Sequence, residues 1–329
     1  MSDLFTEIKA KVKQDRPTVV FPEGLDERIL KAAHQLATDE VVKPILIGNQ
    51  EEIAAKAKDL NVSLTGIEVI NPASYEQFDM LVQSFVERRK GKETEESARE
   101  KLLDPNYFGT MLVHVDLADG LVSGAVHSTG DTVRPALQII KTQPGIKKTS
   151  GVFVMVKDEQ KFVFGDCAIN ISPNDEELAE IAIATAETAK VFDLDPKVAM
   201  LSFSTKGSAS SIETKKVSAA TKIAQESRPD LVIDGEFQFD AAFVPAVAQK
   251  KAPDSPLRGE ANVFIFPSLE SGNLGYKIAQ RLGGYEAIGP ILQGLNKPVN
   301  DLSRGCNEQD VYKLALITAM QSIQNKVLS

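Results

Sequence analysis

A guanidinium, a thiol and a carboxylate lie close together in the segment "NDLSRGCNEQD", residues 300–310. Cys306 follows Arg304 by two positions, and Asp310 comes four positions later. A cysteine nucleophile ordinarily needs a neighbouring base such as histidine, and this segment has none, so we expect Cys306 to be a small packed residue. The span from Asn307 to Asp310 has the spacing of a helix capping box. The sequence therefore leaves two roles open for Asp310: it caps the helix, or it is the base of an anion-binding site.

The segment "VHSTGDTVRP", residues 126–135, is a second candidate. Ser128 and Thr129 offer hydroxyls, and Arg134 offers a planar set of donors beside a helix that we expect to begin near Pro135. Hydroxyls, backbone N–H groups and an arginine at a helix start suit a phosphate group. An ordinary helix cap with a surface arginine is the alternative.

Other polar segments carry weaker signals. "SFSTKGSASS", residues 202–211, and "ESGNLGYK", residues 270–277, each read as a strand-to-helix turn that contacts a ligand or only starts a helix. Arg88 and Arg89 end a predicted helix, where cations complement the negative end of the helix dipole. That position alone explains them without a ligand.

Several common signatures are absent from the sequence. It contains no GxxxxGK[ST], no GxGxxG after a strand, no HExxH and no CxxC. The three histidines, His34, His114 and His127, are scattered without metal-ligand spacing. We therefore expect neither a metal site nor a conventional nucleotide fingerprint.

Charge and composition narrow the class of partner. The formal net charge is −9, which opposes a general attraction to nucleic acid or to an anionic membrane. No segment approaches the roughly 20 apolar residues of a membrane span, and the N-terminal residues lack the apolar region of a secretory signal. Two cysteines cannot form a disulfide framework. A cytoplasmic protein with small-molecule ligands is the expectation.

The hydrophobic pattern predicts an α/β protein. From residue 17, short β-branched runs alternate with amphipathic helical patterns, which is typical of mostly parallel sheets covered on both faces. Near Pro144 this alternation stops, and "GVFVMV" and "KFVFGD" flank a short polar turn like an antiparallel hairpin. A second strand-helix series follows, and a final apolar helix covers roughly 308–327. We expect two domains, 1–145 plus 296–329 and 146–295, with ligands at strand carboxyl ends and in the cleft between the domains.

Four motifs together resemble the phosphate acetyltransferase (phosphotransacetylase) family in its short form. They are "FPEGLDERILKAA", "HSTGDTVRPALQIIKTQPG", "FPSLESGNLGYKIAQRL" and "NDLSRGCNEQD", in chain order. The resemblance covers essentially the whole chain. It implies two α/β/α domains of the isocitrate/isopropylmalate dehydrogenase-like architecture, an active site in the cleft and a homodimer. The implied reaction converts acetyl-CoA and phosphate to acetyl phosphate and CoA, reversibly, with CoA as a substrate and no tightly bound cofactor.

The resemblance also implies roles for individual residues. Arg304 would stabilise the transition state, Asp310 would be the base for the CoA thiol, and Ser303 would orient the substrate. Arg134 would hold the phosphoryl end, and Arg89, the better match of two adjacent arginines, would contact substrate. The predicted substrate contacts are completed by Ser128, Thr129, Tyr276 and Lys277.

The chemistry is consistent with these residue types. Acetyl transfer between phosphate and a thiol passes through an oxyanion beside a charged phosphate, and fixed guanidinium groups stabilise both without a metal. We predict direct attack in a ternary complex, with no covalent enzyme intermediate. The alternatives are a phosphate butyryltransferase, a metal- and NAD(P)-dependent decarboxylating dehydrogenase, and a non-catalytic phosphate-binding regulator.

Overall fold

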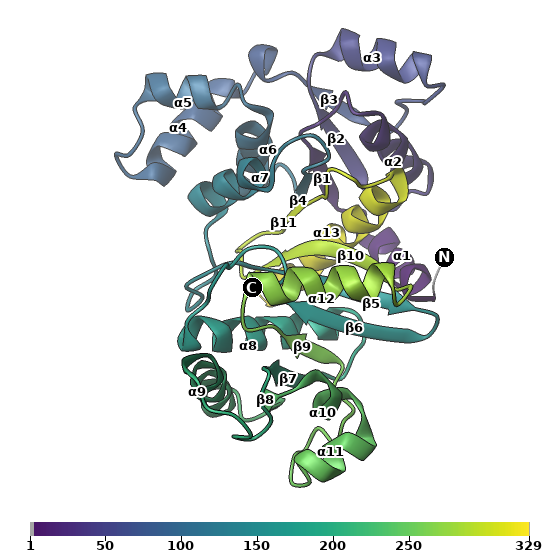
Figure 1. The fold of residues 1–329 in the computed structure, drawn as a ribbon. Helices are drawn as coiled ribbons and strands as arrows, with labels where there is room; N and C mark the ends of the chain where they lie inside the picture. The colour runs from purple at the N-terminus through teal and green to yellow at the C-terminus, as the bar shows by residue number, and fades with distance from the viewer. Residues whose placement is uncertain (1–2, 329) are drawn as a thin grey trace. The chain divides into compact units, whose positions relative to one another are not determined.

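The chain divides into two compact units in the computed structural model, which describes residues 3–328 (Figure 1). Unit 1 comprises Met1–Gln143 and Leu295–Ser329, and unit 2 comprises Pro144–Gly294. The chain thus leaves unit 1 once and returns to it near its end. Both units combine helices with a sheet, as the strand-helix alternation predicts.

Unit 1 is built on a five-stranded sheet in which every pairing is parallel. The strand order is β11-β4-β1-β2-β3. The strands are β1 (Thr18–Phe21), β2 (Lys43–Ile47), β3 (Glu68–Ile70), β4 (Gly120–Ser123) and β11 (Val299–Asp301). Because all strands run the same way, their carboxyl ends share one edge of the sheet.

The helices of unit 1 cover both faces of this sheet. A Cβ on Gly109 of α6 would lie 2.9 Å from Val20 and 3.0 Å from Leu121, whereas one on Gly120 would lie 2.5 Å from Thr318 of α13. Adjacent strand residues point to opposite faces, so α6 and α13 lie on opposite sides of β4. The helical elements are α1 (Asp3–Asp15), α2 (Glu27–Thr38), α3 (Gln50–Asp59), η1 (Pro72–Ser74), α4 (Phe78–Arg89), α5 (Glu95–Lys101), α6 (Pro105–His114), α7 (Thr129–Pro135), η2 (Ala136–Ile140) and α13 (Glu308–Leu328).

Helix α2 shows how the local sequence produces this packing. Asp26 caps it by accepting hydrogen bonds from the backbone N–H groups of residues 28 and 29. Ile29, Ala32, Ala33 and Leu36 are all buried, as their helical spacing predicts.

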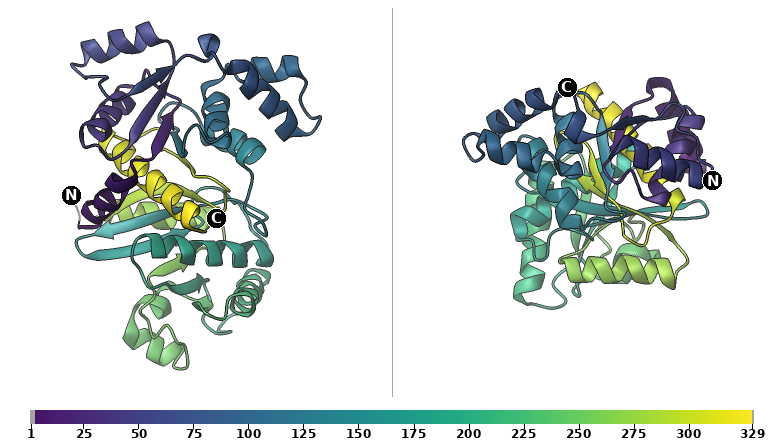
Figure 2. Two further views of the ribbon diagram at one scale, coloured as in Figure 1. Left: turned by 180° about the vertical axis from the view of Figure 1, so that it is seen from behind. Right: turned by 90° about the horizontal axis from the view of Figure 1, so that it is seen from above.

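Helix α13 is the long apolar helix predicted at the end of the chain. Figure 2 shows it, in yellow, beside α1, in purple, and the ammonium group of Lys313 lies 5.2 Å from the centre of the Phe5 ring. The Tyr312 hydroxyl donates a 2.6 Å hydrogen bond to Asp39 at the end of α2. Within residues 3–328, no helix combines the length and the apolar character that crossing a membrane requires.

Unit 2 has a mixed six-stranded sheet in the order β10-β5-β6-β9-β7-β8. Strands β5 and β6 form the predicted antiparallel hairpin, and β6, β9, β7 and β8 pair in parallel. The strands are β5 (Ser150–Lys157), β6 (Gln160–Gly165), β7 (Lys197–Leu201), β8 (Val232–Phe237), β9 (Val263–Ile265) and β10 (Glu286–Gln293). The helices are α8 (Asp175–Val191), α9 (Ile212–Ser227), α10 (Phe239–Phe243), α11 (Pro245–Lys251) and α12 (Leu269–Arg281).

Strands β10 and β11 have no counterpart among the predicted elements. Pro290 interrupts β10, and a proline within an apolar run argues against a strand. The strand tolerates it because its pairing with β5 shifts register between Ile288 and Ile291. Strand β11 is only three residues long and follows Pro298, so its sequence reads as a linker.

Two helix starts differ from the predictions. Helix α7 begins at Thr129, not near Pro135, because Ser128 and Asp131 form a reciprocal capping box upstream of the proline. Helix α12 begins at Leu269, so residues 270–277 form helix and not a turn. Gly272 serves close packing there, since an added Cβ would lie 2.3 Å from the carbonyl oxygen of Asp166.

Candidate functional site

Three loops of unit 1 meet at the carboxyl edge of its sheet. They follow the neighbouring strands β1, β4 and β11 and comprise residues 22–26, 124–128 and 302–307. From β1 the chain builds the sheet outward through β2 and β3 on one side, and through β4 and β11 on the other. The reversal between β1 and β4 is a topological switch point, which is where open α/β sheets bind ligands.

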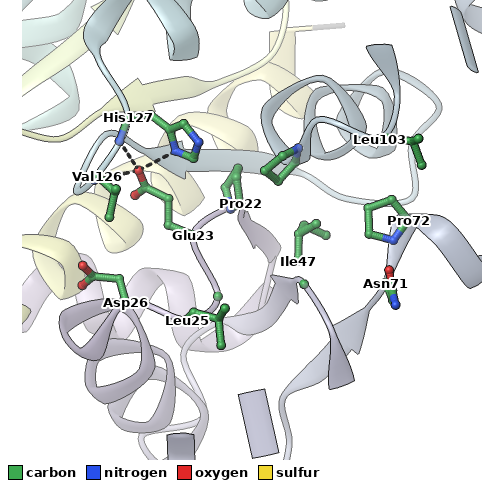
Figure 3. A pocket seen from close by; sticks show the side chains of 13 residues that line it. Pro22, Glu23, Leu25, Asp26, Ile47, Asn71, Pro72, Leu103, Val126 and His127 are labelled. Carbon is green, nitrogen blue, oxygen red and sulfur yellow. Dashed lines mark hydrogen bonds and ion pairs between the residues drawn. The ribbon is translucent and has the colours of Figure 1, made fainter. Parts of the chain in front are cut away.

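Glu23 bridges this switch point. Its buried carboxylate accepts hydrogen bonds from the backbone N–H groups of Gly124 at 3.2 Å and of Ala125, Val126 and His127 at 2.8 Å. The same carboxylate lies 2.8 Å from Nδ1 of His127 (Figure 3). Glu23 therefore fixes the loop after β4 to the loop after β1.

We expect Glu23→Ala to lower the free energy of unfolding by about 3 kcal/mol, because it leaves four N–H groups without their acceptor. The measurement is urea denaturation, with Glu176→Ala, an exposed acid in unit 2, as the control. A denaturation midpoint equal to that of the control variant would show that the loop does not depend on Glu23.

The segment after β11 presents Ser303 and Arg304 to solvent. Its turn is closed by a 2.9 Å hydrogen bond from the N–H of Cys306 to the carbonyl of Ser303. The hydroxyl of Ser303 accepts a 3.3 Å hydrogen bond from the N–H of Gly305. The guanidinium group of Arg304 has no hydrogen bond or ion pair with any residue in the described part of the chain.

Asp310 caps α13 and keeps one oxygen available. Its Oδ2 accepts a 2.9 Å hydrogen bond from the N–H of Asn307, whose side chain accepts bonds from the N–H groups of Gln309 and Asp310. The capping interpretation is thus confirmed. Oδ1 of Asp310 has no partner among residues 3–328, so the cap does not exclude a role as base.

Cys306 is a buried thiol. Burial raises its pKa to about 11, although the Arg28 guanidinium, 3.7 Å from the sulfur, favours the thiolate. The thiol therefore carries its proton at neutral pH, and the thiolate is the nucleophilic form.

We expect Cys306→Ser and Cys306→Ala to keep most of the acetyl-transfer activity, since a protonated thiol without a base is a poor nucleophile. Steady-state turnover and a search by mass spectrometry for acetylated protein provide the check. Loss of turnover in a folded variant, together with an acetyl group trapped on Cys306 of the wild-type chain, would restore the thiol mechanism.

The segment at the start of α7 is joined to β11. Ser128 is the cap residue of α7, and its hydroxyl donates a 2.7 Å hydrogen bond to Asp131. Thr129 donates a 2.7 Å hydrogen bond to Asp301. Arg134 is exposed in the last turn of α7, not beside the helix N-terminus as predicted, and has no partner within the described residues. The segments carrying Arg134 and Arg304 thus meet through Thr129 and Asp301.

Asp301 is the last residue of β11 and is 1% exposed. The pKa of its carboxyl is raised to about 6, chiefly by burial and to a smaller extent by the charge of Glu23, while the nearby hydroxyls of Thr129 and Thr132 oppose the rise. The Thr132 hydroxyl and Oδ1 of Asp301 are both buried, and neither has a hydrogen-bond partner among the described residues. Thr132 therefore influences the pKa of Asp301 by its proximity and not through a hydrogen bond.

This raised pKa predicts a pH dependence of stability. The folded chain holds the Asp301 proton up to about pH 6, whereas an unfolded aspartate loses it near 3.9. The folded state is therefore penalised by roughly 3 kcal/mol as pH rises through this window. Relative to the wild type, Asp301→Asn should gain stability between pH 4 and 7 in urea denaturation. A pH-independent difference between the two proteins would contradict the assignment.

Arg88 and Arg89 lie near the C-terminal end of η2, which continues α7 and is the end of that helical pair remote from Ser128. Arg88 donates hydrogen bonds to the carbonyls of Ile139 and Ile140 at the end of η2, and Arg89 pairs with Glu93 at 3.8 Å. From Thr129 to Ile140 the α7–η2 pair spans about 16 Å at 1.5 Å per residue. Arg89 is therefore not grouped with Ser128 and Thr129.

Tyr276 and Lys277 belong to unit 2. The Tyr276 ring stacks on Phe153 with 4.0 Å between ring centres, and Lys277 Nζ lies 5.8 Å from the centre of the Tyr276 ring. Tyr276 is half-buried in the core of unit 2, while Lys277 is exposed.

A pocket of about 380 Å³ opens beside the switch point, over the carboxyl ends of β1, β2 and β3 (Figure 3). Its polar side chains are Glu23, Asp26, Asn71 and His127, and neither lysine nor arginine lines it. Its other lining residues are Pro22, Gly24, Leu25, Ile47, Gly48, Pro72, Leu103, Pro105 and Val126. Two carboxylates make it poorly suited to a phosphate group.

Glu23, Asp26, Arg28 and Asp301 belong to this site although no motif in the sequence predicts a role for them. Their signal is the dense charge of "EGLDER" directly after the first predicted strand, and an aspartate three residues before Arg304. Within residues 3–328 there is no group of three or more His, Cys, Asp or Glu side chains placed to hold a metal ion.

Comparison with known proteins identifies the family of the chain. Residues 3–319 match the family model described as phosphate acetyl/butaryl transferase. Phosphate acetyltransferase from Bacillus subtilis (strain 168) is 67% identical over 323 residues, which are 98% of this chain and all of that protein. The phosphotransacetylase structure from Streptococcus pyogenes has a TM-score of 0.96 at 58% identity, covering 98% of this chain and 100% of that one. The EutD phosphotransacetylase from Staphylococcus aureus has a TM-score of 0.93 at 59% identity, covering 97% and 98%. The chain therefore belongs to the phosphate acetyl/butaryl transferase family, and its activity is that of a phosphate acetyltransferase.

Proposed function

We propose that acetyl transfer takes place at the carboxyl edge of the unit 1 sheet, where Arg134 binds the phosphoryl group and Arg304 stabilises the oxyanion of the acetyl group beside it. The observation that carries this proposal is the pair of unpaired, exposed guanidinium groups on segments joined by the Thr129–Asp301 hydrogen bond. Arginine without an internal partner binds phosphate bidentately. The carboxylate-lined pocket beside the switch point is the less suitable place for the same anion.

The proposed step is direct attack by CoA on acetyl phosphate, and its reverse. The CoA sulfur forms a bond to the acetyl carbon, its proton passes to Oδ1 of Asp310, and the bond from the acetyl carbon to the phosphate oxygen breaks. Arg304 stabilises the oxyanion that develops on the carbonyl, and Arg134 holds the departing phosphate. Preorganised donors of this kind act mainly on the transition state, where the charge develops.

The remaining predicted residues take supporting roles in this proposal. Ser303 orients the acetyl group from the turn that carries Arg304, and Ser128 and Thr129 support the phosphate side while serving as cap and link. Tyr276, Lys277 and Arg89 contact the more distant parts of CoA. CoA enters and leaves as a substrate, with no tightly bound cofactor.

Unit 1 carries the catalytic motif in this proposal, and unit 2 carries the contacts of a homodimer. Helix α12 exposes Leu274 and Ile278, and its C-cap residue Leu282 continues the same spacing of four residues. A second copy that covers this apolar stripe removes it from water. Light scattering should find a dimer for the wild type and a smaller particle for Ile278→Asp; an unchanged mass would place the interface elsewhere.

The two free thiols fit a cytoplasmic location.

The acyl preference is proposed to be acetyl over butyryl. Relatives that are 58–67% identical carry the name phosphate acetyltransferase, and they do not favour a butyryltransferase or a dehydrogenase. The experiment is phosphate-dependent release of free thiol from acetyl-CoA and butyryl-CoA by the purified protein, with and without a chelator. We expect release from acetyl-CoA that is insensitive to the chelator. Faster release from butyryl-CoA would overturn the acyl preference, and a requirement for metal would overturn the metal-free mechanism.

A further inference from the structure

Arg28 connects the three loops that meet at the carboxyl edge of unit 1. It lies in the first turn of α2, and its guanidinium group donates hydrogen bonds to the carbonyl oxygens of Arg304 at 2.8 Å, Cys306 at 3.2 Å and Ala125 at 2.8 Å. Its sequence distance from these partners is 276, 278 and 97 residues. One side chain therefore fixes the main chain after β4 and after β11 to the helix that follows β1.

Asp26 holds the guanidinium group in place. It accepts hydrogen bonds from Nε of Arg28 at 3.0 Å and from Nη2 at 2.8 Å, while also capping α2. The guanidinium group has five N–H bonds. With two oxygens of Asp26 and three carbonyls, all five have an acceptor.

This arrangement acts on the backbone of Arg304 and leaves its side chain free. The carbonyl of Arg304 is bound by Arg28, whereas its own guanidinium group has no partner among the described residues. The turn of residues 303–306 is exposed at its tip, and its internal contacts are those of Ser303 with Gly305 and Cys306. Without the carbonyl contacts, that tip would have few restraints on its position.

We propose that Arg28 is a positioning residue for acetyl transfer, which holds the turn of residues 303–306 so that Arg304 and Ser303 meet the reacting acetyl group. This inference rests on the proposed role of Arg304. A displacement of about 1 Å in a positioning element can cost on the order of 100-fold in rate. Lysine cannot substitute, because an ammonium group has three donors on a flexible stem and lacks the planar fork.

The test compares Arg28→Lys and Arg28→Ala with the control variant Arg99→Lys. Arg99 is an arginine of unit 1 that pairs with Asp79 and Glu95, and its side chain is 43% exposed. We expect Arg28→Lys to lower kcat by about 10- to 100-fold, with KM for acetyl-CoA and phosphate changed by less than about 3-fold. Arg99→Lys should behave as the wild type. Guanidinium ion added at millimolar concentration should restore part of the turnover of Arg28→Ala and should not stimulate the wild type.

A second readout reports on the turn itself. Cys306 is 8% exposed beside Arg28, so its reaction with a thiol reagent measures how firmly the turn is held. We expect labelling of Cys306 to be at least about 10-fold faster in Arg28→Lys than in the wild type, as the turn opens more often. Cys167 is fully buried in unit 2, and a Cys306→Ser background separates its signal.

The two readouts must change together. A loss of kcat with unchanged labelling, or faster labelling with unchanged kcat, contradicts the positioning role, and so does wild-type behaviour in both. Failure of the proposed function is recognised separately. If Arg304→Ala retains normal turnover, the role of Arg304 is wrong, whereas labelling still decides whether Arg28 holds the turn.

Discussion

Replacement of Arg304 by alanine is expected to lower kcat by about 10² to 10³, the usual loss when one preorganised donor to a developing oxyanion is removed. Arg304 is exposed, and its guanidinium group has no partner within residues 3–328. The folded state therefore does not depend on it, and the urea midpoint should change by no more than the equivalent of about 0.5 kcal/mol. Steady-state kinetics with acetyl-CoA and phosphate measure the first effect, and denaturation measures the second.

Arg304→Lys provides the matched comparison. It keeps the positive charge but loses the planar pair of donors, so its turnover should fall between that of Arg304→Ala and that of the wild type. Turnover of Arg304→Ala within about threefold of the wild type would mean that the oxyanion is stabilised elsewhere. A large loss of stability in either variant would mean instead that the side chain has a structural partner.

Asp310→Asn is expected to have the second large effect, a loss of about 10² to 10⁴ in kcat with little change in KM. The amide cannot accept the proton of the CoA thiol. It can still accept the hydrogen bond from the N–H of Asn307, so the cap of α13 survives. The measurement is kcat and KM for CoA in the direction that consumes acetyl phosphate.

The control for capping is Glu177→Gln, which changes the corresponding acid in the capping box of α8. Its turnover should equal that of the wild type, because glutamine preserves the cap and Glu177 is not among the predicted substrate-binding residues. Near-normal turnover of Asp310→Asn would mean that Asp310 serves only as a helix cap and is not the base. An equal loss in both variants would attribute the effect to helix capping and not to base catalysis.

Much of the fold could be predicted from local sequence. A run of β-branched residues marks β1, a run of apolar residues marks β7, and the spacing of Ile29, Ala32 and Leu36 marks the buried face of α2. The signal fails where a local rule competes with the tertiary structure. Pro290 conceals strand β10, and Pro135 conceals the true start of α7, which its capping box determines.

The candidate site was predictable only in part. Ser303, Arg304 and Asp310 stand out because their chemistry is concentrated in one short segment, whereas Glu23 and Arg28 act across sequence distances of 97 to 278 residues. No local pattern records such contacts, because strand order decides which loops become neighbours. The family resemblance is confirmed, and the individual residue roles remain predictions that the variants test.

The most direct test of direct transfer is isotope exchange between labelled free CoA and acetyl-CoA in the absence of phosphate. Attack within a ternary complex requires phosphate before CoA can leave, so we predict no exchange above the rate without enzyme, and rapid exchange once phosphate is added. Rapid exchange without phosphate would show that the acetyl group rests on the protein, and would contradict the mechanism proposed for Arg304 and Asp310.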